Sequence, residues 1–421
     1  GALIMELTKV IANNIVRLLE ENNRTQAELS TYLDISRQTL SNYLKGNSTI
    51  DSVRLVKTAD FFNIPVTALL ETTAVSRAPM LLRAAPQDHD AIEDIEDLIS
   101  DYLARYEELC SKVGCASHFF PEQHDLFIEH AGKRISVNHE LRKYPPKKFK
   151  IDNQLRDDIY AIADNQRRVL GLSECGAIEL IKALTARGIN VIFLDFKLTS
   201  IFGLSTCGNS QGCYIFVNSN ESITVERQLF TVAHEYAHLI LHRPLFSNDS
   251  NVPMSSQYVE LLDKMADTFA GRLLCPPDIV LAYEKYYSAS NSTLKSISPI
   301  TVRLKQKLHV SFQSLLIALE SYGLVSKSVV NEYFRWANSN NSLKDEPWSI
   351  KDDRILYGQF EEAKEEHIIE IFHKLFMKEK EAVSEDDIMF FLGCDIEKAN
   401  TILGKFESEL EKFNEFDDIF D

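Results

Sequence analysis

The chain has 421 residues, of which 45% are apolar and 25% are charged, as is typical of a soluble globular protein with two or three domains. No apolar run approaches the roughly 20 residues that a membrane-spanning helix needs, which argues against a membrane protein. Residues 1–5 lack the basic region and long apolar stretch of a secretory signal peptide. We therefore expect a cytoplasmic protein that makes no membrane contact.

The net charge of −17 is unevenly distributed along the chain. Residues 327–421 hold 24 acidic against 12 basic side chains, whereas residues 1–75 hold 8 against 7. Because no segment has a broad basic surface, any nucleic-acid-binding site must depend on a few local basic side chains.

The seven cysteines are scattered along the chain and form no CxxC pair. Their odd number and spacing predict reduced thiols in a cytosol rather than a framework of disulfides. For Cys207 and Cys213 we favour a position on either side of a hairpin turn over a zinc site.

The periodicity predicts a mainly α-helical fold with a small β-sheet (α+β), divided into residues 6–75, 76–150, 151–326 and 327–421. The first segment begins with a helix over residues 10–21. Thr25 and Glu28 have the spacing of a capping box and open a helix that runs through Leu33. Ser36 caps a second helix over residues 37–45, which Gly46 ends. Shorter helices are expected over residues 51–62 and 65–70.

Two short helices joined by a tight turn favour a helix-turn-helix, although a plain helical bundle has similar spacing. Polar donors at the start of the second helix can reach base edges in the major groove, and neighbouring residues can contact phosphates. The predicted DNA-contacting residues are Gln26, Ser36, Arg37, Gln38, Thr39, Asn42 and Lys45, with Tyr43 on the same outer face.

The string TQAELSTYLDISRQTLSNYLKG, residues 25–46, resembles the Xre/Cro-type repressor family, and the resemblance extends over about residues 8–70. It implies a DNA-binding head that recognises a double-stranded DNA operator. It also implies a homodimer, in which two heads share two half-sites.

The second segment, residues 76–150, is predicted to hold a linker over residues 76–87, a long amphipathic helix over residues 89–113, and an irregular stretch over residues 115–150. Helices then follow over residues 152–170 and 174–187, and strands over residues 189–193 and 214–217. Further helices are expected over residues 223–242, 257–274 and onward to about 322. The last segment is acidic and helical beyond a probable boundary at residues 337–345.

The apolar segment 229–241 contains the sequence His234-Glu235-Tyr236-Ala237-His238. Residues at i and i+4 lie on one face of a helix, so the two imidazoles can bind one Zn²⁺ ion. The glutamate after the first histidine can act as the general base of a hydrolase. The alternative is an ordinary core helix, but buried imidazoles beside a buried carboxylate require a partner such as a cation.

A third protein ligand is expected on the helix over residues 257–274, where Glu260, Asp263 and Asp267 share one face. Their spacing does not choose among them, and at least two of the three should be solvated surface carboxylates.

The segments 227–242 and 263–276 resemble the ImmA/IrrE family of zinc metallopeptidases, and the resemblance covers about residues 150–325. It implies a zincin-like domain in which Zn²⁺ is held by His234, His238 and Asp263, with Glu235 as the catalytic base. Asp263 stands where the family usually has a glutamate, one methylene longer, so Asp267 and Glu260 are fallback ligands.

The same resemblance implies a short sheet beside the catalytic helix, whose edge strand can pair with a substrate peptide. Residues 214–218 are the predicted edge. We expect His242, one turn beyond His238, to lie behind the metal ligands or at the surface rather than to bind the metal.

Together these features predict a DNA-binding regulator whose zinc-dependent peptidase domain cleaves a repressor or another regulatory protein. Two alternatives remain open. One is a non-catalytic transcription factor that uses the metallopeptidase-like domain as a sensor or a dimerisation module. The other is an antitoxin or scaffold whose acidic C-terminal helices bind a basic partner.

Overall fold

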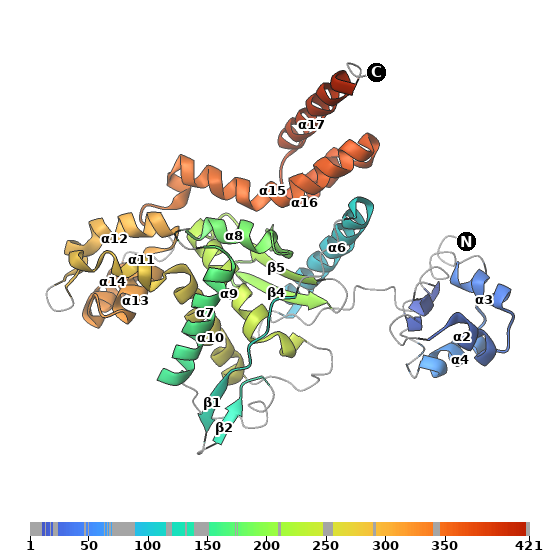
Figure 1. The fold of residues 1–421 in the computed structure, drawn as a ribbon, viewed down its shortest axis with the longest axis horizontal. Helices are drawn as coiled ribbons and strands as arrows, with labels where there is room; N and C mark the ends of the chain where they lie inside the picture. Colours follow the sequence, from blue (N-terminus) through green and yellow to red (C-terminus); the bar gives the residue numbers. More distant parts are fainter. Residues whose placement is uncertain are drawn as a thin grey trace. The chain divides into compact units, whose positions relative to one another are not determined.

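The structure is a computed structural model of the whole chain. It describes residues 11–12, 14–16, 18–19, 24–45, 48, 50–62, 64, 66, 69, 89–114, 120–130, 133–138, 151–172, 174, 176–208, 212–246, 256–288, 292–339 and 346–417. The chain forms two compact units, Gly1–Arg77 and Ala78–Asp421 (Figure 1). The predicted linker and most of the predicted helix over residues 65–70 lie outside the described residues.

The smaller unit contains helices α2 (Gln26–Tyr32), α3 (Arg37–Leu44) and α4 (Ser52–Phe62). The Thr25 hydroxyl accepts a hydrogen bond from the Glu28 N–H, and the Glu28 carboxylate accepts one from the Thr25 N–H, which confirms the predicted capping box. Ser36 caps α3 by accepting from the Thr39 N–H. Leu29, Leu40 and other apolar side chains form the core of this unit.

The larger unit is mainly helical with a small β component, as the sequence predicts, and it contains two small sheets (Figure 1). Its elements up to the central sheet are α6 (His89–Val113), β1 (Phe127–His130), β2 (Lys133–Ser136), α7 (Asn153–Val169), α8 (Ile178–Thr185), β3 (Ile189–Leu194), β4 (Gly203–Gly208) and β5 (Gly212–Asn218). After the sheet come α9 (Val225–Leu241), η2 (Arg243–Phe246), α10 (Ser256–Leu274), α11 (Pro277–Leu281), η3 (Glu284–Tyr286), α12 (Leu294–Leu308) and α13 (Phe312–Ser321).

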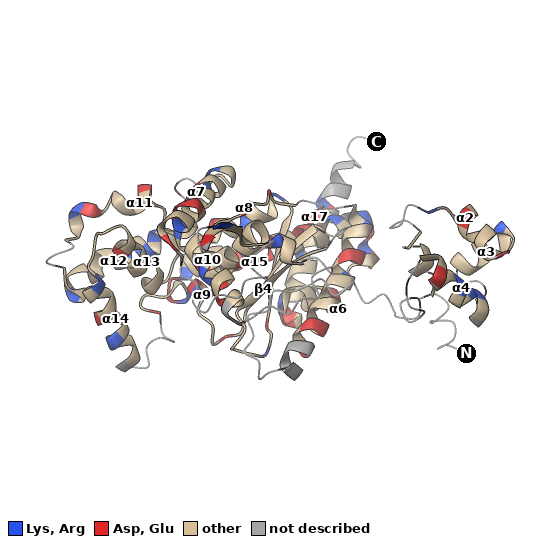
Figure 2. Cartoon of the chain, turned by 90° about the horizontal axis from the view of Figure 1, so that it is seen from below, with Lys and Arg blue, Asp and Glu red and all other residues tan. Residues whose placement is uncertain are grey.

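The last helices belong to the same unit: α14 (Lys327–Ser339), η5 (Ile350–Asp352), α15 (Arg354–Lys378), η6 (Lys380–Ala382), α16 (Glu385–Leu392) and α17 (Ile396–Asp417). Helix α14 packs on α12 and α13, and α15 packs on α6, α8 and β3. Both acidic and basic positions occur along these helices (Figure 2). None of the described helices is long and apolar enough to cross a membrane.

The three-stranded sheet has the order β3-β5-β4, in which β5 is parallel to β3 and antiparallel to β4. The prediction that residues 214–218 form the edge strand is therefore wrong. Every residue of β5 is buried, as expected for a strand that is paired on both sides. Among the described residues, β4 pairs only with β5, so it is an edge strand of this sheet.

Helices cover both faces of this sheet. Helix α9 packs against β4 and β5. On the other face, Tyr102 and Tyr106 of α6 contact Phe216 and Tyr214, which are alternate residues of β5. Alternate positions of β5 therefore face either α9 or α6.

Cys207 and Cys213 flank the β4–β5 turn, as predicted, but they form a disulfide, so the prediction of reduced thiols is wrong for this pair. The two residues are directly opposite in the antiparallel register, with Cα atoms 4.3 Å apart. This register brings the two sulfur atoms within bonding reach. Among the described cysteines, Cys110, Cys275 and Cys394 are reduced thiols.

A second correction concerns residues 115–150, which the sequence predicts to be irregular. Residues 127–136 contain the antiparallel pair β1–β2. The flanking residues hold the C-terminal end of α9, where carbonyl groups lack partners within the helix. Asn138 donates from its side-chain amide to the Leu241 carbonyl oxygen, and the His124 N–H donates to that of Ile240.

Candidate metal centre

Helix α9 carries the two histidines of the HExxH sequence on a face that looks toward helix α10. Thr224 caps the helix by accepting a hydrogen bond from the Arg227 N–H. His234 and His238 are 4% and 3% exposed, so both imidazoles are almost fully removed from solvent. They lie one turn apart, and their Nε2 atoms are 3.1 Å from each other.

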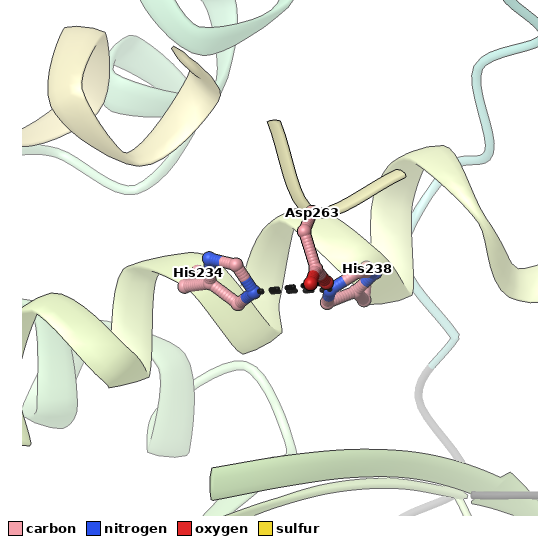
Figure 3. Close-up of side chains that lie close together, drawn as sticks. All are labelled: His234, His238 and Asp263. Atoms are coloured by element: carbon pink, nitrogen blue, oxygen red, sulfur yellow. Dashed lines mark hydrogen bonds and ion pairs between the residues drawn. The ribbon is translucent and has the colours of Figure 1, made fainter. Parts of the chain in front are cut away.

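Asp263 of α10 completes a group of three potential metal ligands (Figure 3). Its Oδ1 atom lies 3.9 Å from His234 Nε2 and 3.7 Å from His238 Nε2. Ligand atoms bound to one Zn²⁺ ion at about 2.0–2.2 Å in a tetrahedron lie roughly 3.3–3.5 Å apart. The three atoms therefore fit a small divalent cation after shifts of a few tenths of an ångström, and the shorter aspartate does reach the histidines.

Asp267, the predicted fallback ligand, occupies a different position. Its Oδ1 atom lies 2.8 Å from His234 Nδ1, the ring nitrogen that faces away from the three-atom group. A carboxylate in this position fixes the proton on Nδ1, so that Nε2 carries the lone pair that binds a cation. Glu260, the other alternative, is 64% exposed and pairs with Lys264 on the same helix.

His242 supports His238 in a similar way. The two Nδ1 atoms are 2.8 Å apart, and His242 is fully buried. Burial lowers the pKa of His242 to about 3, so its ring is neutral at physiological pH. If His238 holds its proton on Nδ1, the neutral ring of His242 accepts that hydrogen bond, and the lone pair of His238 again lies on Nε2.

Glu235, the predicted catalytic base, points toward strand β4 and is 4% exposed. Its Oε2 atom accepts a hydrogen bond of 2.9 Å from the Ser205 hydroxyl. Strand β4 approaches the helix closely at Gly203, where a Cβ atom would clash with the Thr231 side chain. Ser205 could not be predicted from the sequence, because a serine within a short strand carries no sign of its partner 30 residues away.

A buried ionic cluster holds the N-terminal end of α9 in place. Lys305 of α12 lies 3.2 Å from Glu226 Oε1 and 2.9 Å from Glu346 Oε1, and all three side chains are at most 8% exposed. Lys305 also donates to the carbonyl oxygens of Pro347 and Trp348. Glu226 accepts from the Ile350 N–H, and Glu346 from the Phe312 N–H. No pattern in the sequence indicates this cluster.

The predicted DNA-contacting residues lie on or beside α2 and α3. Gln26, Ser36, Arg37, Gln38 and Lys45 are exposed, and Thr39 and Asn42 are half-buried. The hydroxyl groups of Ser36 and Thr39 are hydrogen-bonded to each other at 2.8 Å. Tyr43 does not lie on the outer face as predicted, since it is 9% exposed and packs in the core of the unit.

Two family models match the chain at these places. A helix-turn-helix model matches residues 15–69, which include α2 and α3. A peptidase-family model described as the IrrE N-terminal-like domain matches residues 184–320, which include α9, α10 and the sheet. No curated protein matches the chain.

Proposed function

Because the chain joins a helix-turn-helix domain to an IrrE N-terminal-like domain, we propose that it is a DNA-binding transcriptional regulator with a zinc-dependent peptidase centre. The observation that carries this proposal is the convergence of His234, His238 and Asp263, with Glu235 directly after His234 in the sequence. In this proposal the protein acts in the cytoplasm and cleaves a repressor or another regulatory protein.

In the proposed reaction His234, His238 and Asp263 hold a Zn²⁺ ion. The ion supplies Lewis-acid activation of a water molecule and of the scissile carbonyl group. Glu235 removes the proton from the attacking water and later delivers it to the leaving amine. Asp267 and His242 keep the Nε2 atoms of the two histidines deprotonated and correctly oriented.

We propose that the substrate peptide pairs with strand β4 rather than with β5. Strand β4 lies at the end of the sheet and packs against α9, next to Glu235. An extended peptide added to such an edge is held by backbone hydrogen bonds, so recognition depends little on its sequence.

Metal analysis tests the candidate centre directly. We expect about one zinc ion per wild-type chain and almost none in the Asp263→Ala and His238→Ala variants, because each removes a ligand. The Asp267→Asn variant should bind zinc about 10- to 100-fold more weakly but still bind it, because it loses only the support of His234. Equal loss of metal in Asp263→Ala and Glu260→Ala would contradict this ligand set.

A second experiment tests the DNA-binding head, which we propose binds an operator as a homodimer. Selection from a random double-stranded DNA pool should yield a site with two related halves. The Gln38→Ala variant should lose discrimination at one position of each half, by about 1–3 kcal/mol. The Lys45→Ala variant should weaken binding to all sequences alike and reduce its salt dependence.

Cleavage can be measured although the substrate is unidentified. Metal-loaded protein is incubated with proteins of its host cell, and newly formed N-termini are identified by mass spectrometry. Sequence-specific DNA binding together with zinc binding but no new N-termini would favour the alternative of a non-catalytic sensor.

A further inference from the structure

The hydrogen bond between Ser205 and Glu235 joins strand β4 to the candidate catalytic helix. Ser205 is fully buried and Glu235 is 4% exposed, so water competes little for either group. The Ser205 hydroxyl donates to Oε2 of the carboxylate at 2.9 Å. A hydrogen bond to a charged acceptor in such surroundings is stronger than one between neutral groups.

The backbone of β4 fixes the position of this hydroxyl. Ser205 lies on β4 opposite Ile215 of the central strand β5, in the antiparallel register. Two residues earlier, Gly203 allows α9 to approach the strand, and a Cβ atom there would lie 3.4 Å from Glu235 Cγ. Two residues later, the Cys207–Cys213 disulfide joins β4 to β5. The backbone of β4 is thus fixed on both sides of Ser205, by its close packing on α9 at Gly203 and by the disulfide at Cys207.

From these contacts we infer that Ser205 is a positioning residue for the base. By donating to Oε2 it fixes the orientation in which the Glu235 carboxylate takes up and delivers the proton. The inference rests on the proposed function. It adds that β4, the strand proposed to bind the substrate peptide, also orients the proposed base Glu235 through Ser205.

The contact itself can be tested in the metal-free protein, independently of catalysis. Thermal unfolding is measured for Ser205→Ala, Glu235→Ala and the double variant. We expect Ser205→Ala to lower Tm clearly in the wild-type background and much less when residue 235 is alanine, because the hydroxyl has then lost its acceptor. Strictly additive shifts in Tm would overturn the inference.

The catalytic consequence is tested with the metal-loaded protein and a peptide that the wild type cleaves. We expect Ser205→Ala to reduce kcat about tenfold to hundredfold and to leave KM and metal content nearly unchanged. Ser205→Thr, which keeps the hydroxyl, should restore part of kcat. In a Glu235→Gln background, Ser205→Ala should cause no further loss.

Ser136→Ala is the matched control, because the buried Ser136 hydroxyl of β2 also donates to a carboxylate, that of Asp125, at 2.8 Å, but lies outside the three-stranded sheet. It should leave kcat unchanged. An unchanged kcat in Ser205→Ala, or an equal loss in Ser136→Ala, would overturn the inference while the proposed function stands. A wild-type protein that binds no metal and cleaves nothing would overturn the proposed function, and the Tm measurements would still decide whether Ser205 holds Glu235.

Discussion

On the proposed mechanism, the Glu235→Gln variant is expected to cleave a peptide substrate about 10²- to 10⁴-fold more slowly than the wild type. Glutamine has nearly the same shape and still accepts a hydrogen bond from Ser205, but it cannot take a proton from the attacking water. The proposed metal ligands His234, His238 and Asp263 are unchanged, so metal content should stay near one ion per chain. Cleavage rate and metal content are therefore measured on the same preparation.

Glu260→Gln serves as a control for this substitution. Glu260 is 64% exposed on α10, pairs with Lys264, and does not belong to the group of three potential metal ligands. The same chemical change there should affect neither cleavage nor metal content. If Glu235→Gln cleaves at the wild-type rate, Glu235 is not the base. If it loses the metal, its carboxylate has a structural role in the centre.

Features that depend on contacts within one or two helical turns could be predicted from the sequence. The capping hydroxyls of Thr25 and Ser36 bond to backbone groups three residues away, so spacing alone located α2 and α3. The i, i+4 spacing of His234 and His238 likewise placed both imidazoles on one helix face. The choice of Asp263 over its neighbours depended on family resemblance, because helical spacing treats Glu260, Asp263 and Asp267 alike.

Features that depend on pairing between distant segments could not be predicted in this way. The apolar run at residues 214–217 indicated a strand but not its neighbours, and β5 proved to be central. Cys207 and Cys213 can bond because the register of β4 and β5 sets them opposite each other. Ser205 meets Glu235 only through the packing of β4 against α9.

Loss of the Lys305 ammonium group is expected to destabilise the protein strongly. The Lys305→Met variant keeps most of the side-chain volume but leaves Glu226 and Glu346 buried without their counter-charge. Removing one partner of a buried ionic group typically costs about 3–5 kcal/mol. Urea unfolding of the two proteins at neutral pH measures this difference in the free energy of unfolding.

Lys112→Met is a suitable control, because Lys112 pairs with Glu108 on the exposed face of α6, where both side chains are about half exposed or more. An exposed pair of this spacing contributes at most about 0.5 kcal/mol. Similar losses in the free energy of unfolding for Lys305→Met and Lys112→Met would show that the buried cluster does not stabilise the N-terminal end of α9.

The pH dependence of the Lys305→Met variant should reveal the cause of its instability. Burial raises the pKa of Glu346 above its usual value of 4.5 even when Lys305 is present. A carboxyl group with a raised pKa binds a proton more readily in the folded than in the unfolded chain, so acidification stabilises the folded state through this group. Without Lys305 the pKa should rise further. The stability deficit of the variant should therefore shrink as the pH falls from 7 toward 5. Adding Glu226→Gln and Glu346→Gln to the variant should recover part of the lost stability at neutral pH, because neutral amides need no counter-charge.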